Sequence, residues 1–118
     1  QGPIECCQAV GLALKAIDKQ CRDNGLELGI IETINTREKG CYKSVLLKLE
    51  SKSHDAQAKQ LAITWQGSML WMCQSRYRPK HKRKNWYFSG EVFEIDEEHL
   101  TKEHLVPVAN TLIRLTRR

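Results

Sequence analysis

Apolar residues recur at three- and four-residue steps through the first part of the chain, from Ile4 to Cys21. This spacing places them on one face of a helix, and it predicts a helix of about 20 residues. Pro3 suits the first position of that helix, because a proline there loses no hydrogen bond that the helix would otherwise make. Asn24 and Gly25 tolerate left-handed backbone and are predicted to end it.

Two segments after this helix alternate between apolar and polar positions. The alternation over residues 26–34 and 42–50 predicts two strands, each with one buried face. Residues 53–62 are rich in Ala and Gln and begin with Ser53, a favourable N-cap, so a short helix is predicted there.

The following segments predict a further pair of strands. Residues 68–77 carry apolar side chains at both parities, which favours a central strand covered on both faces. Another strand is predicted at residues 86–95, with a bulge at Ser89 and Gly90. Such a bulge would bring four large side chains to one face: Trp86, Phe88, Phe93 and Ile95.

The order helix, strand, strand, helix, strand predicts an α+β fold. It corresponds to most of a ferredoxin-like split βαβ sandwich, a mostly antiparallel sheet with two helices, and lacks only the first strand of that arrangement. A strand is therefore expected ahead of residue 1. The last apolar segment, residues 108–117, fits a helix through Val108, Leu112 and Leu115.

The composition fits one small globular domain. The chain has 118 residues, of which 41% are hydrophobic, which suffices for one buried core and excludes a disordered tail. No apolar run approaches the length of a membrane span, so no membrane association is predicted. With 19 Lys and Arg against 14 Asp and Glu, the net charge is +5, which favours a polyanionic partner.

The positive charge is concentrated in one part of the chain. Residues 37–90 hold 12 basic and 3 acidic residues, whereas the remainder holds 7 basic and 11 acidic ones. Within residues 76–84, six of nine residues are Lys or Arg, with aromatic residues among and after them. Such a hairpin loop can neutralise phosphates and stack on bases, so it predicts RNA binding. The candidate RNA-binding residues are Arg76, Tyr77, Arg78, Lys80, His81, Lys82, Arg83, Lys84, Asn85 and Trp86.

Trp86 has two possible roles in this hypothesis, since it could anchor the loop or stack on RNA. The basic segment also has two other interpretations. It could be a solvated hairpin tip without a partner, or residues 79–84 could act as a nuclear-localisation signal.

Other candidate chemistry is sparse. Five cysteines without a C-x-x-C pair favour free, buried thiols in a reducing cytosol; the alternative is a reactive thiol at Cys6 or Cys7, in the first turn of the helix. Nucleotide-binding glycine motifs and a G-x-S-x-G elbow are absent from the sequence. The acidic residues within 91–98 are interpreted as a solvated face, with a metal site as the alternative. No catalytic residue and no cofactor are expected in this chain.

Two stretches of the sequence resemble a known family. QGPIECC at residues 1–7, followed by Ala9 and Val10, resembles the start of the bacterial peptide chain release factor homologue family, release factor H. WMCQSRYRPKHKRKNWY at residues 71–87 resembles the R-P-x-H-x-R-K-N-W segment of that family, and WQGS at residues 65–68 fits it as well. The positions that match this segment are Arg78, Pro79, His81, Arg83, Lys84, Asn85 and Trp86.

The resemblance implies a protein that binds a stalled ribosome and releases the nascent chain from its tRNA. Hydrolysis in this family depends on a separate domain with a Gly-Gly-Gln loop, and this sequence contains no Gly-Gly-Gln. The P-x-T and S-P-F tripeptides that read stop codons in ordinary release factors are also missing. Recognition of RNA damage or shape at the decoding region of the small-subunit rRNA is therefore expected. The family's partner is an RtcB-type RNA ligase, which implies rescue of ribosomes whose RNA has been cut.

The resemblance also implies a division of the chain. Residues 1–106 are expected to form a ribosome- and RNA-recognition domain in the cytoplasm. Residues 107–118 are expected to begin a Gly-Gly-Gln-type domain, as a strand with Ile113 and Leu115 facing inward. The competing hypothesis is a protein-interaction module that docks an RNA ligase without touching RNA, through an apolar strand face and the acidic residues 91–98.

Overall fold

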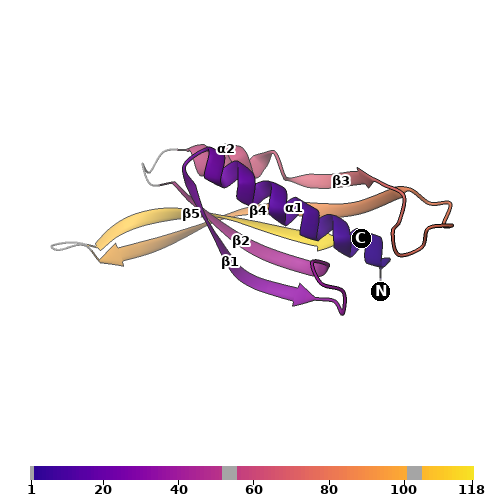
Figure 1. Ribbon diagram of the computed structural model, residues 1–118. Helices are drawn as coiled ribbons and strands as arrows, with labels where there is room; N and C mark the ends of the chain where they lie inside the picture. The colour runs from indigo at the N-terminus through magenta and orange to yellow at the C-terminus, as the bar shows by residue number, and fades with distance from the viewer. Residues whose placement is uncertain (1, 52–55, 101–104) are drawn as a thin grey trace.

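The computed structural model describes residues 2–51, 56–100 and 105–118 (Figure 1). Two helices and five strands follow one another along the chain: α1 (Ile4–Asp23), β1 (Leu26–Asn35), β2 (Tyr42–Ser51), α2 (Gln57–Ile63), β3 (Gly67–Met72), β4 (Asn85–Leu100) and β5 (Leu105–Arg117). The long first helix begins at Ile4, so Pro3 is its N-cap residue and not its first helical residue as predicted. Gly25, with a φ of 68°, follows the end of the helix, as the sequence predicts.

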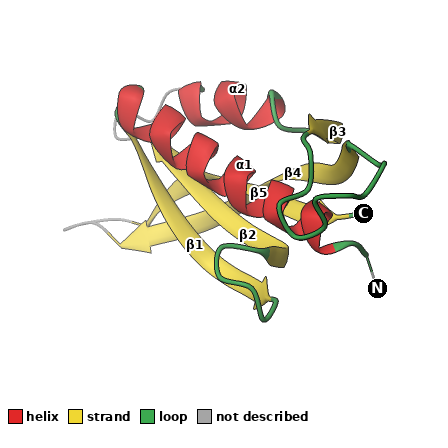
Figure 2. Ribbon diagram, turned by 45° about the vertical axis from the view of Figure 1, so that its right-hand side comes forward, coloured by secondary structure: helices red, strands yellow, loops and turns green. Residues whose placement is uncertain are grey.

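The strands form one antiparallel sheet in the order β1-β2-β5-β4-β3. Both helices lie on the same face of this sheet, and the other face is open (Figure 2). Helix α1 packs across β1, β2, β4 and β5, whereas α2 covers β2 and β5. The predicted α+β class is therefore confirmed, and the arrangement is compatible with a ferredoxin-like fold.

The core lies between the helices and the inward side chains of the two middle strands. In β2, Val45 and Leu47 have no exposed surface, and they pair with Leu115 and Ile113 of β5, which are equally buried. Complete burial of each such side chain stabilises the fold by roughly 1.5–3 kcal/mol. The last segment of the chain is thus a strand with Ile113 and Leu115 inward. The boundary expected between residues 106 and 107 falls inside this strand.

The predicted position of β3 is wrong. It forms an edge of the sheet and not its centre, because only β4 pairs with it. Its side chains alternate between the two faces of the sheet. Met69 and Trp71 pack against the core, whereas Leu70 and Met72 lie on the open face and are 47% and 70% exposed. Apolar residues at both parities therefore mark an edge strand with an exposed apolar face in this protein.

The predicted bulge at Ser89 and Gly90 is also absent. The register of β4 runs without interruption against β3 and β5 through these residues. Phe93 and Ile95 therefore face the open side of the sheet, where Phe93 is 38% exposed and Ile95 is 44% exposed. Gly90 has a different role, because a Cβ at this position would overlap the carbonyl oxygen of Trp65.

The second helix begins later than predicted. Helix α2 spans Gln57–Ile63, with Ala56 at its N-cap position. The predicted cap, Ser53, lies outside the described residues. Ala58 and Ala62 are the buried residues of this helix, and their small side chains allow it to lie close to the sheet.

Gly11 in α1 marks a close contact between the helix and the β1–β2 loop (residues 36–41). A Cβ at Gly11 would overlap the carbonyl oxygen of Gly40, which itself has a φ of 78°. Because both groups in this contact belong to the backbone, neither can rotate away as a side chain could. The contact thus fixes the β1–β2 loop against the second turn of α1.

We expect Gly11→Ala to lower the free energy of unfolding by about 1–3 kcal/mol, because the added methyl group collides with the Gly40 carbonyl. Urea denaturation measures this change. Gly29→Ala is the matched control, since a Cβ there would have Lys48 O as its nearest neighbour, at 4.0 Å. If Gly11→Ala instead stabilised the protein, as alanine does inside a free helix, the close contact would be disproved.

Candidate nucleic-acid interface

The basic segment forms a closed loop between β3 and β4, the β3–β4 loop (residues 73–84). Its base is closed where the backbone N–H of Cys73 donates to the carbonyl of Lys84 at 2.8 Å. Inside the loop, the Gln74 side chain donates to the carbonyl oxygens of Pro79 and His81, at 3.0 and 3.2 Å. The loop therefore has a defined shape that its own backbone carbonyls help to hold.

Trp86, in β4, anchors the base of this loop. Its side chain has no exposed surface, and its Nε1 donates to the carbonyl of Cys73 at 2.8 Å. Two guanidinium groups lie over the ring, that of Arg83 at 4.8 Å and that of Arg78 at 5.7 Å from its centroid. A ring covered in this way offers no face to a base, so anchoring is the role that the geometry supports.

A buried carboxylate in the first turn of α1 binds the same loop. Glu5 has no exposed surface, and its Oε2 accepts hydrogen bonds from Ser75 Oγ at 2.6 Å and Arg78 Nε at 2.8 Å. Arg78 Nη2 donates to Oε1 at 2.7 Å, which completes a two-point ion pair. Helix and loop are thus held together across more than seventy positions of sequence.

These contacts determine the ionisation of Glu5. Burial alone would raise the pKa of this carboxyl group, but several effects outweigh it: the hydrogen bonds from Arg78, Ser75 and the backbone, and the positive charge of Arg78. Together they lower the pKa of Glu5 from 4.5 to about 2. Glu5 is therefore ionised in the folded protein at neutral pH.

Ser75 and Tyr77 give the first half of the loop its shape. Ser75 is buried, and its Oγ accepts hydrogen bonds from the backbone N–H of Tyr77 at 3.1 Å and of Arg78 at 3.0 Å, as a turn-forming serine does. The hydroxyl of Tyr77 lies 3.2 Å from Cys41 Sγ in the β1–β2 loop and accepts a hydrogen bond from Arg76. The contact with Cys41, together with partial burial, raises the pKa of Tyr77.

The remaining cations of the loop point outward. All of them are exposed, and Lys80, Lys82 and Lys84 form no ion pair within the described part of the chain. Arg83 is stacked on Trp86 and donates to the carbonyl of Asn85 at 2.8 Å, which fixes its position without neutralising it. The outward set comprises Arg76, Lys80, Lys82, Arg83 and Lys84.

The structure thus divides the ten predicted residues into two groups. Five are the outward cations just named. Arg78, Tyr77, His81, Asn85 and Trp86 hold the loop, with the His81 Nδ1 accepting a hydrogen bond from the Arg83 backbone at 3.0 Å. Sequence reasoning missed Glu5 and Ser75, on which this support depends.

The structure does not support a reactive cysteine or a metal site among the described residues. Cys6 and Cys7 are 0% and 3% exposed, and burial raises the pKa of the Cys7 thiol, so the structure argues against a reactive thiolate there. Within residues 2–51, 56–100 and 105–118, no three His, Cys, Asp or Glu side chains come close enough together to hold a metal ion. Neither described helix is long and apolar enough to cross a membrane.

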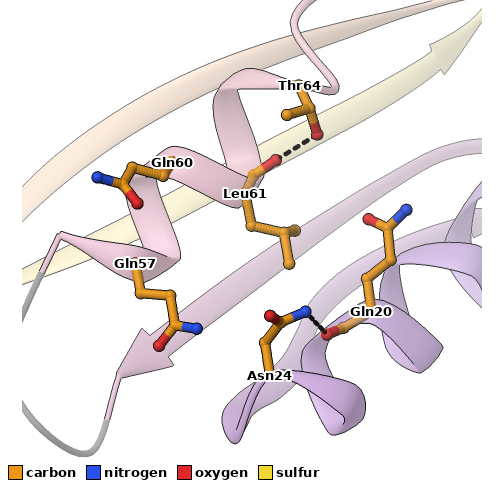
Figure 3. A pocket seen from close by; sticks show the side chains of 6 residues that line it. All are labelled: Gln20, Asn24, Gln57, Gln60, Leu61 and Thr64. Carbon is orange, nitrogen blue, oxygen red and sulfur yellow. Dashed lines mark hydrogen bonds between the residues drawn. The ribbon is translucent and has the colours of Figure 1, made fainter.

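A shallow cleft of about 370 Å³ lies between the end of α1 and α2 (Figure 3). Amide and hydroxyl groups surround it, and the side chain of Asn24 turns back to donate to the carbonyl of Gln20 at 2.7 Å. None of its lining residues is ionisable: Gln20, Asn24, Gln57, Gln60, Leu61 and Thr64. The lining therefore contains no acid or base for proton transfer, and none that could activate the Thr64 hydroxyl as a nucleophile.

Comparison with known proteins confirms the resemblance that the two sequence stretches indicate. The chain is 36% identical over 98 residues, 83% of its length, to a peptide chain release factor homolog of Escherichia coli (strain ATCC 25922). The match covers 46% of that protein, so the chain spans about half the length of this relative. No protein-family model matches the chain.

We expect Glu5→Gln to lower the free energy of unfolding by roughly 2–3 kcal/mol at pH 7, because Arg78 loses its charged partner. Since folding lowers the pKa of Glu5, its contribution is complete above the ordinary value of 4.5 and is lost as the pH falls toward about 2. Urea denaturation of the wild type and the variant between pH 7 and pH 2 tests both statements. A stability difference that stayed constant over this range would contradict the ion pair.

Proposed function

We propose, from the similarity to a peptide chain release factor homolog, that this chain is a ribosome-binding unit of a release-factor-like protein. In this proposal the β3–β4 loop binds phosphates of the small-subunit rRNA. The observation that supports this proposal is the geometry of the loop. Hydrogen bonds to Trp86 and Glu5 hold it in place, and its five outward cations are exposed to solvent.

Physical reasons support this assignment. Phosphate contacts position a protein on RNA, and each neutralised phosphate releases counterions, which supplies much of the affinity. A loop whose shape exists before binding loses less conformational entropy when it docks. The guanidinium of Arg83, held by Trp86 and Asn85, is aligned in advance for a planar phosphate contact.

The proposal includes the reaction in which the whole protein takes part. A stalled or damaged ribosome would be rescued by hydrolysis of its peptidyl-tRNA, with catalysis by a Gly-Gly-Gln domain. No residue of this chain has that role. Because the sequence has no P-x-T or S-P-F tripeptide, the loop would recognise RNA shape or damage at the decoding region and not a stop codon. The proposed location is the cytoplasm, and an RtcB-type RNA ligase would repair the cut RNA.

One observation favours a second candidate function. The open face of the sheet carries exposed apolar side chains, among them Leu70, Met72 and Phe93. Apolar surface of this kind is typical of protein–protein contacts. The chain would then dock an RNA ligase or another subunit without touching RNA, and its binding would depend little on salt.

Co-sedimentation with ribosomes at increasing salt distinguishes the two functions. For the triple variant Lys80→Ala, Lys82→Ala, Lys84→Ala we expect weaker binding. We also expect a smaller salt slope, which is the fall in the logarithm of the binding constant per unit rise in the logarithm of the salt concentration. It should decrease by about two to three, because each phosphate contact contributes about one. These side chains are exposed, so the fold is retained.

The matched control removes three positive charges from α1: Lys15→Ala, Lys19→Ala, Arg22→Ala. It changes the net charge equally, but these residues lie some 15–25 Å further along the helix from Glu5. Its affinity and salt slope should stay close to those of the wild type. If both triple variants bound ribosomes like the wild type, the β3–β4 loop would be a solvated turn and the proposal would fail.

A hydrolysis assay tests the assignment of catalysis. The 118-residue chain alone should release no peptide from peptidyl-tRNA on ribosomes, because it has no Gly-Gly-Gln motif. A full-length release factor provides the positive control. Clear turnover by the chain alone would show that it holds catalytic groups of its own.

A further inference from the structure

We infer that the RNA-binding surface extends beyond the β3–β4 loop and includes two more basic segments, the β1–β2 loop with its flanking Lys43 and the end of β5. This inference rests on the proposed function and names residues of the same interface that the sequence did not indicate. The three segments are distant in the chain, but they gather at one end of the molecule, beside the start of α1 (Figure 2).

The first turns of α1 and Gly2, just ahead of the helix, contact all three segments. Glu5 binds the β3–β4 loop through Arg78. Gly11, two turns later, lies against the Gly40 carbonyl of the β1–β2 loop. Gly2, just ahead of the helix, is so close to the end of β5 that a Cβ there would lie 2.6 Å from Arg117 Nη1. The start of α1, together with the residue that precedes it, thus places three basic segments relative to one another.

The β1–β2 loop is also held by hydrogen bonds of its own. Thr36 Oγ1 accepts from the Glu38 backbone N–H at 3.1 Å, and the Cys41 N–H donates to the Glu38 carbonyl at 3.2 Å. The Cys41 thiol then contacts the Tyr77 hydroxyl, which joins the two loops directly. Three basic side chains of this segment are exposed: Arg37, Lys39 and Lys43.

The end of β5 lies beside the base of the β3–β4 loop. The backbone N–H of Arg118 donates to the carbonyl of Tyr87 at 3.2 Å, next to the buried Trp86. Arg117 pairs in register with Phe88 of β4. Arg117 and Arg118 therefore add two cations to the side of the molecule that the two loops already occupy.

The charge at this end is almost entirely positive. Residues 2–8, 36–44, 73–89 and 116–118 contain eleven of the 19 Lys and Arg but only two of the 14 Asp and Glu. One of the two acidic residues, Glu5, is buried and neutralised by Arg78. Ten basic residues and Glu38 remain to interact with a ligand.

A surface of this kind fits folded RNA. Its cations come from three separate segments, so it can bind phosphates that are far apart in the RNA sequence and adjacent in the fold. Among the large exposed apolar side chains of the described residues, only Tyr87 lies within these four ranges, whereas an interface core against protein would need several such side chains together. Charge-driven contact with the phosphate backbone is therefore the chemistry that the surface favours.

The test is the triple variant Arg37→Ala, Lys39→Ala, Lys43→Ala of the full chain, measured with purified small ribosomal subunits at increasing salt. We expect the affinity at 0.15 M salt to fall roughly tenfold to a hundredfold and the salt slope to fall by about two to three. Thermal unfolding should be unchanged, because the three side chains are exposed. The α1 triple variant again controls for net charge.

The outcomes separate this inference from the proposed function. If the Lys80, Lys82, Lys84 variant loses affinity while the Arg37, Lys39, Lys43 variant binds like the wild type, the extended surface is wrong and the proposed function stands. If neither variant loses affinity, both are wrong. If polyglutamate displaces the subunits as efficiently as an equal charge of rRNA does, the surface binds acidic protein, and the inference is overturned.

Discussion

The hydrogen-bonded ion pair between Glu5 and the β3–β4 loop is the constraint on which the proposed binding surface depends. A carboxylate without exposed surface is costly unless its oxygens are fully satisfied, and here Ser75 and Arg78 donate three hydrogen bonds to them. These donors become available together only when the loop adopts one conformation. The free energy that keeps Glu5 ionised therefore also selects the shape of the loop.

This arrangement assigns different roles to cations that look alike in the sequence. Arg78 is used internally, and its charge is cancelled by Glu5. Arg83 is oriented by Trp86, and the lysines between them remain unpaired within the described chain. A buried ion pair is weak evidence for net stability, because hydrophobic replacements often serve as well. Its contribution here is to conformation, since it holds the other cations outward in fixed positions.

Much of the fold could be predicted from the sequence, because it follows from local periodicity. The apolar face of α1, the inward residues Val45 and Leu47, and the hairpin around the basic segment all have clear patterns. The order of the strands could not be predicted in this way. Periodicity shows that both faces of β3 are apolar, but only the tertiary pairing shows that it is an edge strand with Leu70 exposed.

The proposed binding residues follow from charge and composition, which identify the outward cations but not the residues that hold the loop in place. Glu5 stands alone among apolar neighbours in the first turn of α1, and this isolation was the one signal of a buried, paired carboxylate. Its partner, Arg78, is indistinguishable in sequence from the other cations of its loop. Likewise, Arg37 and Lys39 belong to the proposed surface only because the contacts of Gly11 and Cys41 bring their loop beside the β3–β4 loop and the start of α1.

The affinity of Glu5→Gln for small ribosomal subunits tests the central claim most directly. This substitution adds one positive charge, so electrostatic attraction alone would make the variant bind more tightly. The account predicts the opposite: affinity should fall about tenfold, because the loop must be ordered on binding, while the salt slope stays the same. Equal or tighter binding by a folded Glu5→Gln variant would contradict the claim that the buried carboxylate organises the surface.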